Sequence, residues 1–282
     1  SSQVIGISSG FTDLDALTVD ARQPVMVNRV SVLGSTSEIS DADTLVGVST
    51  ISGNGDIVLT TMAADISVNR VVEAHGDGNI LLMAANDLLL EAGVQSTSGN
   101  ISLEAGNDIA QAAGGDVATG DGTIDAQALA GSITMSDGAV TSTFNRNIRY
   151  EATMDVTVGL LDAGAGSVGV VADGAILDSD TDALDILAGQ LALDAPLGIG
   201  EGANHIDISV TTLAAAGSAG IYLTESDSLT VGSVDDVQIR RVTMDGTDEL
   251  QPDPAAVALS GINTIPGDGS IVLQTLDGSL TV

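Results

Sequence analysis

A glycine-rich motif recurs at nearly constant spacing in the first half of this 282-residue chain. Each copy places glycine and a small polar residue directly before a short apolar run that begins at isoleucine. The copies occupy residues 53–59, 76–82, 98–103 and 120–126. Their isoleucines are separated by 23, 21 and 23 residues: Ile57, Ile80, Ile101 and Ile124. A repeat of this length is typical of a solenoid, in which each repeat forms one coil and buries its apolar face against its neighbours.

A shorter spacing lies within each repeat. A second apolar run begins 9 residues after Ile57 and 8 residues after both Ile80 and Ile101. Apolar residues alternate with small or polar ones in these runs, as in half-buried β-strands. Glycine, asparagine and aspartate suit the corners between strands, because glycine adopts positive φ and the polar side chains bond to nearby backbone. The pattern predicts an all-β, right-handed parallel β-helix with coils of roughly 21–23 residues, stacked about 4.8 Å apart, with ladders of Asn and Asp at its corners.

The same pattern divides the chain into four segments. Residues 1–50 are predicted to form an amino-terminal β segment, either less regular than the solenoid or continuous with it. Residues 51–235 carry the parallel β-helix repeats, and residues 267–282 carry the final repeat. Residues 236–266 contain three of the five prolines and an Arg-Arg pair, and are predicted to form a loop or insertion that projects from the rod. At this coil length the whole chain would make roughly 12 coils.

Other repeat folds fit the sequence less well. Leucine-rich repeats have a similar length but need a dense Leu-x-x-Leu-x-Leu pattern. Helical solenoids need an uninterrupted 3.6-residue periodicity, which the 34 glycines break. Calcium-binding nonapeptide repeats need Gly-Gly-x-Gly-x-Asp runs, of which residues 114–116 are only a fragment. A β-sandwich stays open as an alternative for residues 1–50.

The chain is strongly acidic, since 39 Asp and Glu residues face seven basic residues, all of them arginine, for a formal net charge of −32. Such a field repels phosphate backbones and anionic head groups, so neither nucleic acid nor a membrane is expected as a partner. No apolar run is long enough for membrane insertion of this segment. The absence of cysteine excludes disulfides and thiolate metal sites. Aromatic residues make up only 1% of the chain, so aliphatic side chains must fill the core.

One acidic turn has the composition of a cation site. Asp178, Asp180 and Asp182 place three carboxylates at alternate positions, as the start of a calcium loop with oxygen ligands would. The segment then departs from the EF-hand pattern, with Ala183 where glycine is expected and Gly189 where the bidentate glutamate should lie. An exposed acidic turn is the competing interpretation. We therefore expect no obligatory cofactor, and calcium is the one candidate ligand.

Two parts of the second half resemble recurring blocks of giant bacterial surface and adhesin proteins. The first begins with Asn147-Ile-Arg-Tyr-Glu-Ala and extends through Val158-Gly-Leu-Leu-Asp-Ala-Gly-Ala-Gly-Ser-Val. The second comprises residues 197–215, then Gly220-Ile-Tyr-Leu-Thr-Glu and Leu229-Thr-Val-Gly-Ser-Val. Over about residues 50 to 282 the chain is similar to filamentous-haemagglutinin-like exoproteins. This resemblance implies a right-handed parallel β-helix, secretion, surface display, and a role in adhesion or matrix formation.

These observations lead to a structural hypothesis. The chain is expected to be a structural or adhesive segment of a large secreted bacterial surface protein, forming a rigid extracellular rod, stalk or fibre at the cell surface. Its expected partners are neighbouring copies, end to end or side by side, and a host surface or matrix polysaccharide.

The alternative is a polysaccharide-binding or polysaccharide-degrading β-helix with residues 236–266 as its site. Such an enzyme could use the carboxylate pairs Asp235-Asp236, beside the Arg-Arg pair, or Asp13 and Asp15. No catalytic or cofactor-binding residue is assigned, because the chain lacks tryptophan and lysine and has few aromatic residues to line a sugar cleft. His75 and His205 lie too far apart in the sequence to form a metal-ligand motif.

Overall fold

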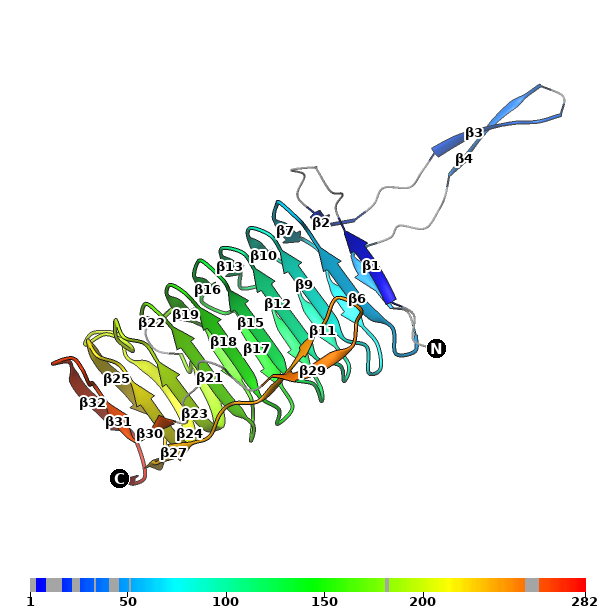
Figure 1. The fold of residues 1–282 in the computed structure, drawn as a ribbon. Helices are drawn as coiled ribbons and strands as arrows, with labels where there is room; N and C mark the ends of the chain where they lie inside the picture. Colours follow the sequence, from blue (N-terminus) through cyan, green and yellow to red (C-terminus); the bar gives the residue numbers. More distant parts are fainter. Residues whose placement is uncertain are drawn as a thin grey trace.

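The computed structural model describes residues 4–8, 17–21, 26–32, 34–40, 46–50, 52–180, 183–251 and 259–282. Every helix or strand element among these residues is a β-strand. Most of the strands pair in parallel and stack into a β-solenoid of about seven turns, seen along its side in Figure 1. The predicted all-β, parallel β-helix class is therefore confirmed. No helix in the described part of the chain is long and apolar enough to cross a membrane.

Three columns of parallel strands form the faces of the solenoid. The first column contains β6 (Asp56–Thr60), β9 (Ile80–Ala84), β12 (Ile101–Ala105), β15 (Ile124–Ala128), β18 (Ile148–Ala152) and β21 (Ser167–Ala172). The second is a seven-stranded sheet of β2 (Leu17–Val19), β7 (Ile66–Val68), β10 (Leu88–Leu90), β13 (Ile109–Gln111), β16 (Ile133–Met135), β19 (Val156–Val158) and β22 (Ile176–Asp178). The third contains β5 (Val48–Ser49), β8 (Val72–Ala74), β11 (Val94–Ser96), β14 (Val117–Thr119), β17 (Val140–Thr143) and β20 (Leu160–Asp162).

The columns change near the carboxyl-terminal end, where short strands give way to long ones. The first and third columns merge in β23 (Ile186–Asp194), which pairs with both β20 and β21 and then with β24 (Ile206–Ala216). Among the described strands, β22 is the last member of the seven-stranded sheet, and isolated bridges link Ile176 to Ile199 and Ile199 to Ile221 beyond it. The parallel strands that follow β24 are β25 (Gly220–Glu225), β26 (Leu229–Val231), β31 (Ile262–Asn263), β32 (Ser270–Thr275) and β33 (Leu280–Thr281).

The core is a stack of aliphatic side chains that stay in register from coil to coil. In the first column, each anchoring residue pairs with its equivalent in the next coil, and all are fully buried: Ile57, Ile80, Ile101, Ile124, Ile148, Val168, Leu191 and Leu213. Residues that are 20 to 24 positions apart therefore become neighbours. The anchors predicted from the sequence are the ones that stack, because a shift of one residue would turn every apolar side chain outward.

Polar ladders occupy the corners, as the sequence predicts. Before several of the anchors, an Asn or Asp side chain accepts a hydrogen bond from the backbone N–H of its equivalent one coil later. The N–H of Asn79 donates to Asp56 Oδ1 at 2.8 Å, that of Asn100 to Asn79 Oδ1 at 2.8 Å, and that of Thr123 to Asn100 Oδ1 at 2.9 Å. The same rule links Asp65, Asp87, Asp108 and Ser132 along the second column. These side chains satisfy backbone donors at corners that the strand pairing leaves unbonded.

Two of the corner glycines are needed for close packing. A Cβ atom on Gly99 would lie 2.0 Å from the Gly78 carbonyl oxygen, and one on Gly122 would lie 2.0 Å from the Gly99 carbonyl oxygen. Neither residue has a positive φ, whereas Gly53 and Gly76 do. The glycine part of the motif therefore reflects both backbone conformation and the close approach of stacked corners.

Residues 1–50 contribute strands to one end of the solenoid. The strand β1 (Val4–Ser8) pairs in parallel with β6, β2 pairs with β7, and β5 pairs with β8. Between them, β3 (Met26–Val30) and β4 (Thr36–Ser40) form an antiparallel hairpin that Figure 1 shows beyond the stacked coils. This excursion, together with the segment after β26, explains why the described residues make about seven turns instead of the roughly 12 expected if the whole chain were coiled.

Replacing one inward-facing residue should cost far more stability than replacing its outward-facing neighbour on the same strand. Ile133 is fully buried on β16, whereas the adjacent Thr134 is exposed. We predict that Ile133→Ala lowers the free energy of unfolding by about 2–5 kcal/mol through lost burial and a cavity. The matched variant Thr134→Ala should lower it by less than about 1 kcal/mol. Urea denaturation of the two variants checks this, and equal losses would contradict the assignment of the core face.

Candidate functional site

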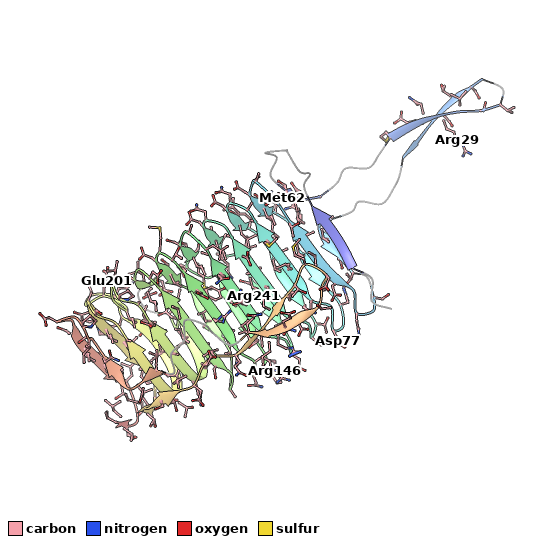
Figure 2. All side chains as sticks on the ribbon, in the orientation of Figure 1. Arg29, Met62, Asp77, Arg146, Glu201 and Arg241 are labelled. Carbon is pink, nitrogen blue, oxygen red and sulfur yellow. The ribbon has the colours of Figure 1, made fainter. Side chains whose placement is uncertain are left out.

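A hairpin lies across the outer surface of the first strand column. Its strands are β28 (Ile239–Val242) and β29 (Asp248–Gln251), which pair antiparallel. Figure 1 shows this hairpin crossing several solenoid strands, and Figure 2 shows Arg241 on it. We call residues 237–250 the strap. The segment 236–266, predicted to project from the rod, thus contains a part that packs against the solenoid.

The strap covers one row of outward-facing residues, which we call the covered row. Its members pair in register from coil to coil: Val58, Leu81, Ser102, Asp125, Arg149 and Gly169. They alternate along each strand with the anchoring residues that face the core, so a solenoid without a cover would leave them in solvent. Instead, the five members with side chains are at most 4% exposed.

The strap matches the covered row residue by residue. A Cβ atom on Gly169 would lie 3.2 Å from Val237 Cβ, so glycine makes room for the beginning of the strap. Val242 packs on Val58 and Leu81. The backbone N–H of Val242 donates to Ser102 Oγ at 2.8 Å. Small, polar and apolar positions of the row therefore each have a complementary partner in the strap.

Asp125 lies between two arginines at the centre of this contact. Its Oδ1 is 3.0 Å from Nε of Arg149, the next residue of the covered row, and its Oδ2 is 2.8 Å from Nε of Arg241 on the strap. Asp125 and Arg149 are only 2% and 1% exposed. A charge removed from water to this extent needs a close partner of opposite sign, and here the strap supplies one of the two cations.

Removing the Asp125 carboxylate should be strongly destabilising. Asp125→Ala would leave the buried Arg149 guanidinium without this counter-ion and would release Arg241, so we predict a loss of about 3–5 kcal/mol in the free energy of unfolding. The matched control is Asp121→Ala, which removes a surface pair with Arg146 (2.6 Å) in which both side chains are more than half exposed. That control should cost about 0–1 kcal/mol. Chemical denaturation of both variants checks this, and similar losses would mean that the strap does not bury the Asp125 pair.

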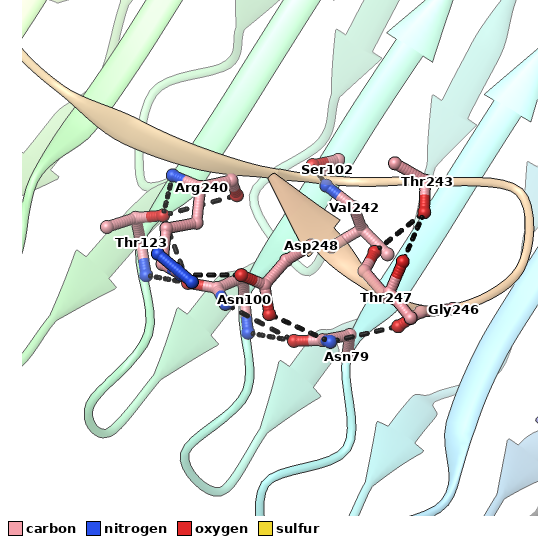
Figure 3. A network of polar contacts seen from close by, with 10 residues as sticks. All are labelled: Asn79, Asn100, Ser102, Thr123, Arg240, Val242, Thr243, Gly246, Thr247 and Asp248. Carbon is pink, nitrogen blue, oxygen red and sulfur yellow. Dashed lines mark hydrogen bonds and ion pairs between the residues drawn. The ribbon is translucent and has the colours of Figure 1, made fainter. Parts of the chain in front are cut away.

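The tip of the hairpin is held by the first corner ladder, as Figure 3 shows. Asn79 Nδ2 donates to the Gly246 carbonyl oxygen at 2.9 Å, and its Oδ1 accepts the ladder bond from Asn100. Thr123 Oγ1 accepts the backbone N–H of Arg240 at 2.8 Å. The Arg240 guanidinium in turn pairs with Asp248 across the hairpin. Ladder side chains therefore serve two purposes, since they join successive coils and also bind the strap.

Asp56 is the acidic residue of this ladder that faces the hairpin tip. Burial raises the pKa of Asp56, the hydrogen bond from the Asn79 N–H opposes that rise, and the negative charges of Asp248 and Asp245 add to it. A raised pKa means that the folded protein holds this proton more tightly than the unfolded chain does. The stability that the Asp56 proton contributes is therefore fully present below the pKa of an unfolded aspartate. It is lost as the pH rises through the pKa of Asp56 in the folded protein.

Because the Asp56 charge is unfavourable in the folded state, we predict that Asp56→Asn stabilises the protein at neutral pH. The amide oxygen keeps an acceptor for the Asn79 N–H, while the charge that faces Asp245 and Asp248 is removed. The gain over the wild type should fade as the pH is lowered to about 3, where an ordinary aspartate is mostly protonated. Thermal unfolding of both proteins from about pH 3 to 7 measures this. A destabilised variant at neutral pH, or a gain that does not depend on pH, would contradict it.

A second candidate site is a cluster of three aspartates between β22 and β23. Asp178 ends β22, Asp185 directly precedes β23, and Asp180 lies between them in sequence. One carboxylate oxygen from each residue lies within 4.8 Å of the other two. Asp178 and Asp180 are half-buried, whereas Asp185 is fully buried. All three offer oxygen ligands, the type that calcium and magnesium prefer.

Backbone bonds fix the positions of these carboxylates. The Asp180 N–H donates to Asp178 Oδ1 at 2.8 Å, and the Ala183 N–H donates to Asp180 Oδ1 at 2.8 Å. Asp185 Oδ2 accepts the N–H of Asp207, its equivalent in the next coil, at 2.7 Å. Burial raises the pKa of Asp185, and the neighbouring charges of Asp178 and Asp180 raise it further. Burial also raises the pKa of Asp178. Protons or a cation must therefore offset the negative charge gathered here.

The structure brings together two of the three residues predicted as calcium ligands. Asp178 and Asp180 lie in the cluster, and Asp182 lies outside the described residues. Asp185 was missed, although it directly precedes the apolar run that begins at Ile186, as Asn79 precedes Ile80. The covered row was missed as well. Its available signal is that Ile57-Val58-Leu59 and Ile80-Leu81-Leu82 are fully apolar where alternation is expected.

The two histidines have separate partners in the part of the chain that the structure describes. His75 lies 3.8 Å from Glu73, and His205 Nδ1 lies 2.9 Å from Thr224 Oγ1 on a different coil. Asp13 and Asp15 lie outside the described residues. The arginines next to Asp235-Asp236 are engaged with Asp125 and Asp248.

The fold places this chain in the class of parallel β-solenoid repeat proteins. No protein-family model matches the chain, and no curated protein and no solved structure matches it significantly. The strap and the aspartate cluster therefore have to be interpreted from their own geometry.

Proposed function

We propose that this chain is a structural or adhesive segment of a large secreted bacterial surface protein, in which it serves as a rigid extracellular rod. The observation that supports this most is the unbroken stack of buried anchors, which runs in register from Ile57 to Leu213. In such a stack each coil adds about 4.8 Å, so about seven turns give a core roughly 34 Å long. The length of the rod is then determined by the number of repeats.

The strap is expected to stiffen the solenoid. It contacts Gly169 at one end and Val58 at the other, so one segment crosses successive coils and binds them from outside. Bending of the solenoid would have to break the Asp125 pairs and the Val242 packing as well as the backbone ladders. A net charge of −32 repels neighbouring rods at low salt, and salty surroundings screen this repulsion so that neighbouring copies can associate.

The polysaccharide alternative has less support. The insertion that would form its site uses Arg240 and Arg241 in ion pairs within the chain. The charge of each guanidinium is thus already offset by a carboxylate of the chain, which weakens its attraction for an acidic sugar.

Electron microscopy of the purified protein, combined with a polysaccharide panel, tests the proposal. We expect short uniform rods, or fibres of rods joined end to end, in negative stain, and no release of reducing sugars from any polysaccharide in the panel. Compact particles would contradict the rod. Release of reducing sugars that disappears in Asp236→Asn would favour the enzymatic alternative, with Asp137→Asn, an exposed turn residue, as the control of equal charge.

A further inference from the structure

The aspartate cluster lies where the cross-section of the solenoid changes. Among the described strands, β22 ends the seven-stranded sheet, and β23 is the first of the two long strands that merge the other columns. Asp178 and Asp185 are at the two ends of the connection between them. The regular ladder of short strands stops here, although backbone bonds still join Asp185 to Leu161 and to Asp207.

Three of the buried oxygens that the structure describes at this corner have no hydrogen-bond donor. Asp185 Oδ1 and Asp178 Oδ2 are both buried and accept no hydrogen bond, and the same is true of Asn204 Oδ1. The Asn204 side chain adjoins Asp178. Asp185 is fully buried, and it belongs to the group of three carboxylates whose oxygens lie within 4.8 Å of one another. A buried carboxylate oxygen with no donor is costly, whereas the aspartates of the corner ladders are more exposed or face the strap.

We propose that Asp178, Asp180 and Asp185 bind a calcium ion. The ligand atoms are all carboxylate oxygens, with neither histidine nor cysteine in the cluster, which favours a hard cation over zinc. Calcium fits better than magnesium, because magnesium retains most of its water whereas the buried Asp185 oxygen requires an ion that gives up water readily. The remaining coordination positions are filled by water on the exposed side of Asp178 and Asp180.

The bound ion would join the end of β22 to the beginning of β23 and close the connection between them. Asp185 extends this link to the next coil through its other oxygen, which accepts the Asp207 N–H. The ion would thus stabilise the coil at which the seven-stranded sheet ends, independently of whether the protein serves as an adhesin. Without an ion, a proton shared by Asp178 and Asp185 is the competing way to reduce the charge.

Calcium titration of matched variants distinguishes these two states. The variants are Asp185→Asn, which keeps an oxygen for the Asp207 N–H, and Asp173→Asn, which removes one exposed charge outside the cluster. Isothermal titration calorimetry reports stoichiometry and affinity. Thermal unfolding in calcium, in magnesium, in sodium chloride of equal ionic strength and in chelator reports the effect on stability.

We expect one tight calcium site in the wild type and in Asp173→Asn, and none in Asp185→Asn. At a calcium concentration roughly 100-fold above Kd, the melting temperature of the first two proteins should rise by about 5 °C. Asp185→Asn should not respond, yet in chelator it should melt no lower than the wild type, because its buried side chain is neutral. Equal responses of all three proteins would show only general screening of an acidic surface and would overturn the site. So would a wild type that shows neither binding heat nor a rise in melting temperature specific to calcium. Circular dichroism of each variant confirms that it is folded.

Discussion

The structure depends on the requirement that every buried backbone N–H and C=O group finds a partner. Along the strands, parallel pairing between coils meets this requirement, but a corner interrupts the pairing at every face. In the first coils the Asn or Asp before the anchor supplies an acceptor to the next coil, as Asp56, Asn79 and Asn100 do in succession. This bond fixes the register between coils, and the register in turn places the isoleucines above one another. Core packing and corner bonding thus specify the same spacing, which is the consistency expected of a well-defined fold.

The stacking of coils also brings carboxylates of successive coils close together. Ladders built from aspartate stack carboxylates one coil apart, and amide side chains relieve the repulsion in places, as Asn86 does by donating to Asp65 and Asn107 by donating to Asp87. A carboxylate that is buried needs a stronger partner, such as a cation. Asp125 meets two arginines, and Asp185 meets no donor for one of its oxygens. The covered row and the aspartate cluster therefore face the same problem, an acidic residue buried in a fold with few cations, and the described contacts solve it fully only in the covered row.

The periodic parts of this structure were predictable from the sequence, and the parts that lack periodicity were not. The repeat spacing reveals the anchoring isoleucines, because each coil repeats the same local requirements: Ile57, Ile80, Ile101 and Ile124. The strap has no such signal: Arg241 meets Asp125, and Val242 meets Ser102, across separations of 116 and 140 residues. Asp178 and Asp180 were found as a local acidic pattern. Asp185 joins them only because the chain turns back at that corner.

Solenoid and strap should behave as one cooperative structure, and amide hydrogen exchange measures this most directly. We expect similarly strong protection for the core strands from β6 to β24 and for the Val242 amide, which donates to Ser102 on the covered row. Asp125→Ala should lower protection in the strap and in the strands beneath it together. Rapid exchange throughout the strap, with the solenoid fully protected, would show that the hairpin is an appendage and that the two parts do not fold as a unit.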